Sequence, residues 1–446
     1  MTNLGTASVR QLTLPLAPPD DEVGVGERRE DAPVCLPNLL KRALGRSNMF
    51  RALKRVRRNR GAPGVDGMTV DQLPKYLKKH WPEIRTQILE GRYRPSPVLR
   101  KEIPKPGGGV RELGIPTVLD RLIQQAVMQV LQREVDRSFS RFSFGFRPGR
   151  SAHQAIACAQ QFLREGYEWV VDLDLERFFD RVVHDVLMSR LRRRVGDRMA
   201  LKLIDRYLKS GAMIGVTLKP TEEGVPQGGP LSPLLANLLL DELDRELERR
   251  GHRFVRYADD VTIFVRSKRA GQRVLTSVSR FLQKRLKLRV NAEKSGVSVP
   301  KRAVLLGFSF TRRDLRRRIS PKALKAFRRR VKRLTRRTRG RSLQQVIWSL
   351  HKYQRGWLAY FGFTECPSPL RELEGWIRRR LRCYCWKQWG RRGYRELKRR
   401  GVTSDLAWNT FKSAHGPWRL SQSPALVYAL PARVFQRMGL PRLANG

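Results

Sequence analysis

The hydrophobic and polar positions of residues 37–310 follow the periods of both helices and strands. Apolar side chains recur at the spacing of one helix face across 119–130. Residues 169–175 and 254–265 are instead short runs rich in β-branched and aromatic side chains, which is typical of strands. Residues 98–116 predict two more strands, joined by a turn of three glycines. The pattern therefore predicts an α+β fold for this part of the chain.

The pattern changes after the mixed region. Between 312 and 341 there are sixteen basic residues and a single acidic one. Apolar and aromatic residues then recur at helical spacing from 346 to 360, which predicts helices with aromatic side chains inside and basic ones outside. We expect the chain after residue 310 to be all-helical. Residues 1–36 have a weak pattern with frequent Pro and Gly, which predicts a flexible extension.

The composition indicates a polyanionic partner. The 446 residues include 92 Lys and Arg against 40 Asp and Glu, a formal net charge of +52. Such a surplus repels itself unless phosphates offset it, so nucleic acid is the expected partner. No apolar run approaches the roughly 20 residues of a membrane-spanning helix, so no membrane partner is expected. Five scattered cysteines form no disulfide framework, which indicates a reducing interior.

Two adjacent aspartates, Asp259 and Asp260, stand at the expected join of a strand hairpin. Close carboxylates repel and raise each other's pKa, so the pair needs a cation. Upstream, Asp172 and Asp174 share one strand face by the period of two. Acidic residues at a strand end facing such a hairpin fit a site for two Mg²⁺ ions, which clamp the attacking and leaving oxygens of phosphoryl transfer. For Asp172, Asp174 or Asp180 taken alone, a cap or a surface residue is the favoured interpretation. Asp174 combined with the Asp259–Asp260 pair favours the metal site.

Seven motifs follow one another along the chain. They are NRGAPGVDGMT, KPGGGVRELGIPTVLDRLIQQ, SFGFRPGRSAHQAI, VPQGGPLSPLLAN, YADD, LRVNAEKSGV and LLGFSF. With DLERFFD upstream of YADD, the chain resembles the bacterial group II intron reverse transcriptase/maturase family, in a compact form that lacks an endonuclease domain. The resemblance implies right-hand polymerase fingers and palm at 37–310, built from an antiparallel sheet and helices. It further implies a thumb or maturase domain at 311–393 and a DNA-interacting region at 394–446.

The resemblance also assigns roles to single residues. It implies that the metal ions are held by the backbone carbonyl of Leu175 and by three carboxylates, those of Asp174, Asp259 and Asp260. It implies that the incoming dNTP is contacted by Lys105, Arg111, Phe179, Gln227 and Lys294. Phe179 would be the bulky gate that excludes a 2′-OH, and Lys294 would donate a proton to the leaving pyrophosphate. The primer grip would be formed by Leu306, Gly307 and Phe308.

The reaction and the partners follow from the same resemblance. The enzyme would extend a DNA primer on an RNA template with dNTPs and two Mg²⁺ ions. It would bind group II intron RNA and target DNA, and assist splicing and retrohoming as a ribonucleoprotein in the bacterial cytoplasm. Longer relatives add an endonuclease with histidines and paired cysteines, so we expect that this chain does not cut the second DNA strand itself. The sequence does not indicate an oligomeric state.

Three other functions fit parts of the pattern. One is an RNA-binding splicing cofactor with an idle polymerase site, although all three aspartates of the metal site are present. Another is a domesticated reverse transcriptase in repair or defence, which a structured intron RNA around the coding gene would distinguish. An RNA replicase is the third, and Phe179 argues against it because ribonucleotide users need room at the sugar.

We predict that RNA binding by this chain weakens steeply with salt. Each phosphate contacted by Lys or Arg releases counterions, so about six or more contacts lower the affinity roughly 10³-fold between about 50 and 200 mM salt. Titration of a labelled intron-derived RNA at a series of KCl concentrations measures this slope. A flat response would contradict extended contact with phosphates.

Overall fold

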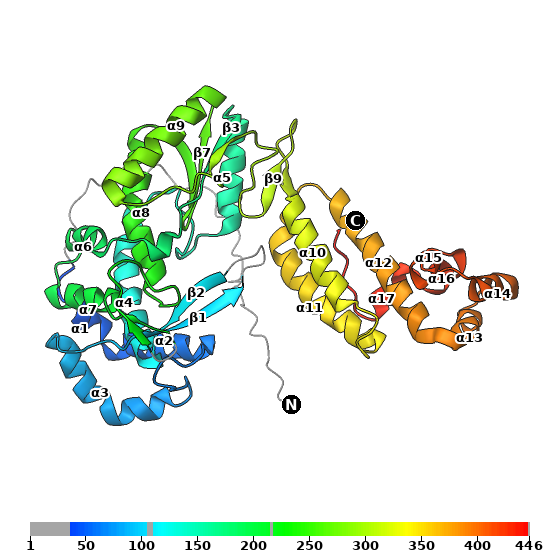
Figure 1. The fold of residues 1–446 in the computed structure, drawn as a ribbon, viewed down its shortest axis with the longest axis horizontal. Helices are drawn as coiled ribbons and strands as arrows, with labels where there is room; N and C mark the ends of the chain where they lie inside the picture. The colour runs from blue at the N-terminus through cyan, green and yellow to red at the C-terminus, as the bar shows by residue number, and fades with distance from the viewer. Residues whose placement is uncertain (1–35, 105–109, 215–216, 445–446) are drawn as a thin grey trace.

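The computed structural model describes residues 36–104, 110–214 and 217–444. A mixed α and β body is followed by an elongated, mostly helical body that extends to one side (Figure 1). The predicted extension at 1–36 lies outside the described residues, except for Leu36, which is buried. Within the described ranges, no helix is both long and apolar enough to cross a membrane.

The palm is built on a sheet with the strand order β6-β7-β3-β8, in which every neighbouring pair is antiparallel. Helices α5, α8 and α9 pack against this sheet. In β7, every residue after the first is buried, so the strand is covered on both faces. The palm elements are α5 (Ala152–Arg164), β3 (Trp169–Leu173), the 3₁₀ turn η2 (Phe178–Asp180), α8 (Ser232–Arg249), β6 (Arg253–Tyr257), β7 (Asp260–Val265), α9 (Lys268–Phe281), the π-helical turn η3 (Leu282–Leu286) and β8 (Gly296–Ser298).

A second sheet, β2-β1-β4-β5, belongs to the fingers and the adjoining helices. Its β1–β4 pair is parallel, so the prediction of an antiparallel sheet holds for the palm and is wrong for this pair. The long connection between the two strands, which includes β2, β3 and several helices, returns β4 beside β1 in the same direction. The elements are α1 (Leu39–Ala43), α2 (Arg46–Asn59), α3 (Leu73–Leu89), β1 (Val98–Pro104), β2 (Val110–Ile115), α4 (Val118–Val135), η1 (Asp136–Ser138), α6 (His184–Arg192), α7 (Arg198–Leu208), β4 (Ala212–Ile214) and β5 (Thr217–Lys219).

The helix predicted across 119–130 is α4, and a side-chain cap fixes its start. The hydroxyl of Thr117 accepts a hydrogen bond from the backbone N–H of Asp120, which satisfies one of the free donors of the first turn. Leu122, Ile123 and Ala126 are fully buried along its core face. The amphipathic spacing thus located this helix correctly.

The sequence predicted an all-helical C-terminal body. This prediction is wrong for its first part, because the body begins with a short hairpin. Strand β10 pairs with β9 and buries Ile319 against the core, which the surrounding run of arginines conceals in the sequence. The elements are β9 (Phe308–Phe310), β10 (Arg317–Ile319), α10 (Pro321–Leu334), α11 (Leu343–Phe361), α12 (Ser368–Trp389), η4 (Gly390–Arg392), α13 (Gly393–Arg399), α14 (Ser404–Lys412), α15 (Pro417–Leu420), α16 (Pro424–Ala429) and α17 (Ala432–Arg437).

One hydrophobic core joins the palm to the C-terminal body. It contains Phe264 of the palm sheet together with Phe308 of β9 and Phe327 of α10. The fully buried ring of Phe308 lies 5.4 Å from the ring of Phe361 between centroids. Burying such aromatic surface is the dominant favourable term in packing, so α10 and α11 are anchored to the sheet that carries the acidic residues.

Most aromatic side chains of the helical body lie inside, as the sequence predicted. Tyr353 and Trp357 are partly buried and pack against the core. Trp348 is an exception, because 59% of it is exposed. The ammonium of Lys352, one turn along α11, lies 3.5 Å from its ring centroid. The exposed indole is thus stabilised by a cation–π contact with Lys352 and not by packing against the core.

Candidate active site at the hairpin between β6 and β7

The two adjacent aspartates lie at the tip of a tight hairpin. Tyr257 of β6 pairs with Asp260 of β7, so that only Ala258 and Asp259 form the turn. Ala258 has a φ of 60°, in the left-handed region that residues with a side chain seldom occupy. Two-residue hairpins require such positive φ values. The acidic pair therefore stands on a short turn whose backbone is held in an uncommon conformation.

Strand pairing brings the third aspartate to the same place. In the register of β3 against β7, Asp172 lies opposite Thr262 and Leu173 lies opposite Val261. Asp174 follows directly, at the level where β7 begins with Asp260. Asp174 and Asp260, which are 86 positions apart in the chain, are thus neighbours at one end of the palm sheet.

The carboxylates at this end act on one another electrostatically. Burial raises the pKa of Asp260 to about 6, with further contributions from the negative charges of Asp259 and then Asp174. Asp172 is enclosed one step further into the sheet and accepts a hydrogen bond from the Thr262 hydroxyl at 3.1 Å. Burial raises the pKa of Asp172 to about 6 as well, and the charge of Asp260 adds to this effect. Both shifts disfavour the charged forms of these carboxyls, so a bound cation would stabilise the cluster.

The donor set suits Mg²⁺, which prefers hard oxygen ligands. Within the described ranges, no three His, Cys, Asp or Glu side chains form a ready-made ligand group. Mg²⁺ is commonly bound by one or two carboxylates together with substrate phosphates and water, so a complete protein cage is not required. The raised pKa of Asp260 therefore fits a cation that arrives with its substrate.

A loop after η3 holds the backbone of Asp174. The amide of Asp174 donates to the hydroxyl of Ser295 at 2.9 Å, and its carbonyl accepts from the amide of Asn291 at 2.9 Å. The same loop carries Lys294, whose ammonium lies 4.0 Å from the Asp174 carboxylate and is largely exposed. The structure thus brings Lys294 to the aspartates. Leu175, whose carbonyl the resemblance implicates in metal binding, follows next and is buried.

Phe179 and the loop of Gln227 are adjacent. The carbonyl of Phe179 accepts a hydrogen bond from the amide of Val225 at 2.6 Å, two residues before Gln227. The Phe179 ring is half-buried and contacts the fully packed Phe178 ring, 5.1 Å away between centroids. These contacts place Phe179, the predicted sugar gate, next to the loop of Gln227, the predicted nucleotide contact.

The same loop packs against the fingers. The carbonyl of Gln227 accepts from the amide of Gly114 in β2 at 3.0 Å. Gly228 has a φ of 143°, and a side chain there would lie only 2.5 Å from the Gly114 carbonyl oxygen. Arg111 lies on β2 opposite Ile103, although its side chain is not among those described. Lys105, the other predicted triphosphate contact, lies outside the described residues.

The predicted primer grip forms the turn that leads into the C-terminal body. Leu306 and Gly307 both have positive φ values, 50° and 86°. The Leu306 carbonyl accepts from the hydroxyl of Tyr360 at 2.8 Å, and the Gly307 carbonyl accepts from the amide of Ser320 at 2.9 Å. Because the Phe308 ring is fully buried, it can act only by supporting the turn. Leu306 and Gly307 are only partly buried, which leaves them as the surface of this motif.

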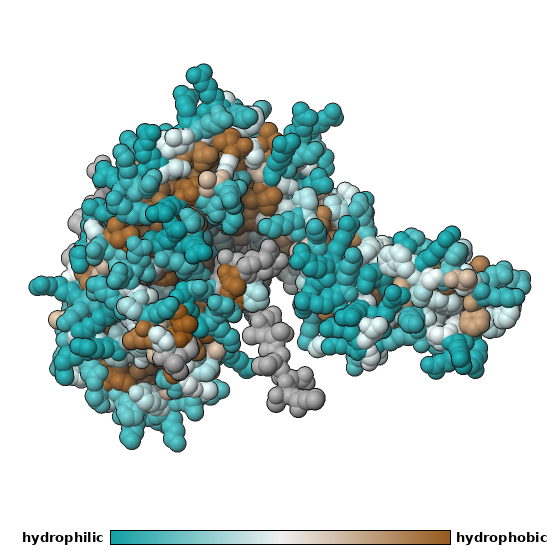
Figure 2. All heavy atoms as spheres, viewed as in Figure 1, coloured by the Kyte–Doolittle hydropathy of each residue, from teal (hydrophilic) through white to brown (hydrophobic). Residues whose placement is uncertain are grey.

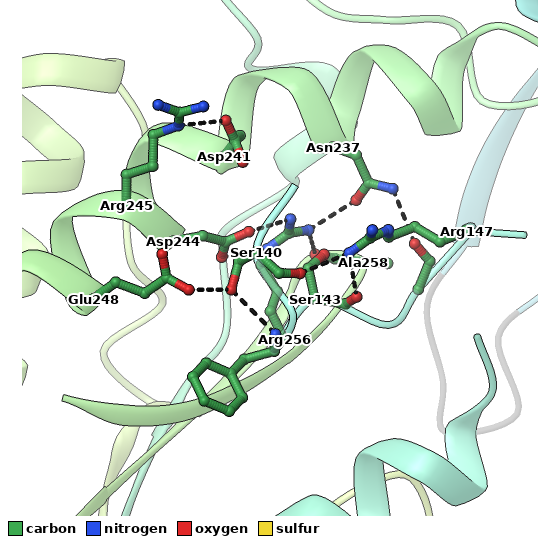
Figure 3. A network of polar contacts seen from close by, with 12 residues as sticks. Ser140, Ser143, Arg147, Asn237, Asp241, Asp244, Arg245, Glu248, Arg256 and Ala258 are labelled. Atoms are coloured by element: carbon green, nitrogen blue, oxygen red, sulfur yellow. Dashed lines mark hydrogen bonds and ion pairs between the residues drawn. The ribbon is translucent and has the colours of Figure 1, made fainter. Parts of the chain in front are cut away.

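Several residues around the hairpin were missed by the sequence reasoning. Asn291 and Ser295 bond the backbone of Asp174. Nothing in the sequence indicated this role except that both residues lie in one of the motifs. Behind the hairpin, Arg256, Asn237 and Asp244 form a buried polar network (Figure 3). In the sequence FVRY, Arg256 stands among apolar residues of an expected strand. This position could have indicated a buried arginine, which would need polar partners.

Comparison with known proteins agrees with this architecture. Residues 103–310 match the family model described as reverse transcriptase (RNA-dependent DNA polymerase), and residues 324–401 match the group II intron maturase-specific domain. The palm, its acidic hairpin and these matches define the protein as a reverse transcriptase. Enzymes of this class depend on divalent metal ions and bind RNA.

The chain is also similar to individual proteins. Protein YkfC of Escherichia coli (strain K12) is 33% identical over 273 residues, which cover 53% of this chain and 72% of that protein. The group II intron-encoded protein LtrA of Lactococcus lactis subsp. cremoris is 36% identical over 188 residues, covering 42% of this chain and 31% of LtrA. A solved partial Cas6-RT-Cas1--Cas2 complex matches with 27% identity and a TM-score of 0.36, over 55% of this chain and 42% of that one.

The chain belongs to the group II intron reverse transcriptase/maturase family. It spans less than a third of the length of LtrA. The matched maturase region covers α10 to α13, which are the helices that follow the β9–β10 hairpin.

We predict that Asp260→Asn stabilises the metal-free protein at neutral pH. A folded-state pKa of about 6, above the ordinary value of 3.8, makes stability fall as pH rises from about 4 to above 6. The amide removes this penalty, so the unfolding midpoint in EDTA should rise by about 1–2 °C at pH 7.5 and show no gain at pH 4. Excess Mg²⁺ should cancel the gain by stabilising the wild type.

Thermal unfolding measured by circular dichroism checks this prediction, with the exposed Asp71→Asn as the matched control. If Asp260→Asn is no more stable than the control in EDTA at pH 7.5, the pKa of Asp260 is not raised by burial and by its neighbours as described.

Proposed function

We propose that this chain is the RNA-directed DNA polymerase of a mobile group II intron, which also binds the intron RNA and assists its splicing and retrohoming. The observation that carries the proposal is the strand register that places Asp174 beside Asp260, next to Asp259 in the hairpin turn. Three carboxylates gathered at the edge of a palm sheet have no structural benefit by themselves, because they repel. They are expected where divalent cations and phosphates meet.

The proposed chemistry is the transfer of a nucleotidyl group to a primer. Asp174, Asp259 and Asp260 would hold two Mg²⁺ ions, with the Leu175 carbonyl as a further ligand. When bound, the ions would activate the primer 3′-OH and offset the charge of the leaving pyrophosphate. Lys294 brings a positive charge within 4.0 Å of Asp174, which supports its role as a proton donor to the pyrophosphate.

Phe179 and Gln227 would select and orient the nucleotide. Phe179 would leave no room for a 2′-OH, and the neighbouring loop of Gln227 would contact the sugar near its 3′-OH. Lys105 and Arg111 would hold the triphosphate, for which a guanidinium and an ammonium are suitable partners. Leu306, Gly307 and Phe308 would set the position of the primer end. The protein contributes mostly orientation and fixed charge, as is general for phosphoryl transfer.

The helical body would bind RNA through its basic surface. In α10, Phe327 and Val331 are buried on one face, whereas Lys325 and Arg333 are exposed on the other. Figure 2 shows the hydrophilic surface over α10 and α11, next to the cleft that separates them from the first body. This arrangement supports binding of the primer–template duplex in the cleft and of intron RNA on the outer face.

The proposal also includes target DNA and an RNA–protein particle as partners. Residues 394–446 would contact target DNA, and the particle would act as a ribonucleoprotein in the bacterial cytoplasm. The domain boundaries at 36, 310 and 393 stay predictions.

We predict that Asp259→Ala abolishes cDNA synthesis, by about 10³-fold or more, while RNA binding stays nearly unchanged. The carboxylate is needed only where the cations bind, whereas RNA affinity comes from many basic residues. Primer extension on an RNA template with dNTPs and Mg²⁺ measures the first effect, and an intron RNA binding assay measures the second. Asp185→Ala, an exposed aspartate at the start of α6, is the matched control. Loss of both activities together would mean that Asp259 is structural.

We predict that Phe179→Ala raises incorporation of rNTPs relative to dNTPs by about tenfold or more, because the ring occupies the space of a 2′-OH. Single-nucleotide extension with matched dNTP and rNTP series gives kcat/KM for each. Phe178→Leu alters the neighbouring buried ring and should keep the selectivity of the wild type. An unchanged ratio in Phe179→Ala would remove the gate assignment.

A further inference from the structure

Arg256 is the largest side chain that is fully buried in the described part of the protein. It lies in β6, two residues before the turn that carries Asp259. A buried charge costs several kcal/mol unless it is paired, and apolar residues of similar volume often replace such pairs without loss. An arginine at this position therefore has a reason beyond filling the core.

The guanidinium of Arg256 contacts three different partners (Figure 3). Its Nε and Nη2 donate to the two carboxylate oxygens of Asp244 at 2.7 and 2.6 Å. Its Nη1 donates to the side-chain oxygen of Asn237 at 2.8 Å and to the backbone carbonyl of Ala258 at 2.9 Å. Asp244 and Asn237 both belong to α8, so one planar group joins this helix to the turn of the acidic hairpin.

The opposite side of the turn is held by the segment before α5. The side-chain amide of Asn237 donates to the carbonyl of Gly145 at 2.9 Å. A side chain on Gly145 would lie only 2.2 Å from the Ala258 nitrogen, so the two backbones are in close contact. Ala258, the residue with the left-handed backbone, is thus fixed at its carbonyl by Arg256 and at its amide side by Gly145.

Fixing this turn has a direct consequence for the site. Asp259 is the second residue of the turn, and Asp260 is the first residue of β7. A rotation of the peptide after Ala258 would redirect both carboxylates away from Asp174. Mutual repulsion of the carboxylates favours such a rotation in the absence of cations. The hydrogen bond from Arg256 opposes it.

We propose that Arg256 is a positioning residue for the polymerase reaction, which aims Asp259 and Asp260 at the metal ions through its bond to the Ala258 carbonyl. The inference rests on the proposed function of this site. Lysine would keep the positive charge beside Asp244 but has no planar fork, so it cannot serve Asp244, Asn237 and the carbonyl together. Loss of the carbonyl contact should loosen the turn without removing any metal ligand.

The test compares Arg256→Lys with Arg194→Lys. Arg194 is also paired with an enclosed aspartate of α8, Asp241, but it does not touch the hairpin. Asn237→Ser is a second variant, which breaks the links to Arg256 and Gly145 without leaving a buried charge unpaired. Mn²⁺ binding is measured by electron paramagnetic resonance. Hydrogen exchange of the amides around 258–260 is measured by mass spectrometry on the same proteins without metal.

We expect Arg256→Lys to weaken Mn²⁺ binding and to lower kcat by about 10–100-fold each, as is typical when the support of a metal ligand is removed. KM for the primer–template should be unchanged, and exchange around the turn should become faster. Asn237→Ser should show the same changes in smaller measure, and Arg194→Lys should show none of them. If Mn²⁺ affinity and hairpin exchange in both variants equal those of Arg194→Lys, Arg256 is only a core residue and the inference is overturned.

The proposed function can fail separately. A wild type that binds Mn²⁺ through Asp259 but extends no primer would contradict the polymerase assignment. The exchange and Mn²⁺ measurements would still decide the role of Arg256.

Discussion

The repulsion between three carboxylates at one end of the palm sheet is the constraint on which the rest of the structure depends. The register of β3 against β7 places Asp174 beside Asp260, and the hairpin adds Asp259. Burial raises the pKa of Asp260 to about 6, and the negative charges of Asp259 and Asp174 add to this effect. Folding therefore concentrates negative charge that only cations, or the positive charges of a bound complex, can offset. That cost in the free protein is consistent with catalysis by fixed charges at a prepared site.

Much of the surrounding structure keeps this end of the sheet from relaxing. The loop of Asn291 and Ser295 bonds both backbone groups of Asp174. On the other strand, the turn at Ala258 contacts Arg256 and Gly145. The core that contains Phe264, Phe308 and Phe327 attaches the helical body to the same sheet. A duplex held by that body would thus have a fixed relation to the aspartates.

The sequence predicted the parts of the fold that depend on local pattern. Helix α4 was located by its apolar spacing, and the strands around the acidic residues by their composition. The parallel pairing of β1 with β4 could not be predicted, because it depends on how distant segments return to one sheet. Strand β10 was hidden by its arginines, since only Ile319 is buried there. The exposure of Trp348 could not be predicted either. Helical spacing alone does not show which face of a basic helix packs against the core.

In the site, too, some residues could be predicted from local pattern and others depend on tertiary packing. Asp174, Asp259 and Asp260 could be singled out because the chain has few acidic residues and these stand at strand ends. Their proximity to Lys294 was implied only by the family resemblance. The network of Arg256, Asn237 and Asp244 spans two elements, and neither element reveals it alone. Long-range polar contacts of this kind are specified by tertiary packing, which periodicity does not encode.

The most direct test of the central claim is the position of bound cations in a complex with primer, RNA template and dNTP. Crystals grown with Mn²⁺ would give anomalous difference density at the ions. The account predicts peaks between Asp174 and the pair Asp259–Asp260, in contact with the triphosphate, with two ions about 3.5–4 Å apart. Peaks elsewhere, or none at these carboxylates in a complex that contains the dNTP, would contradict it.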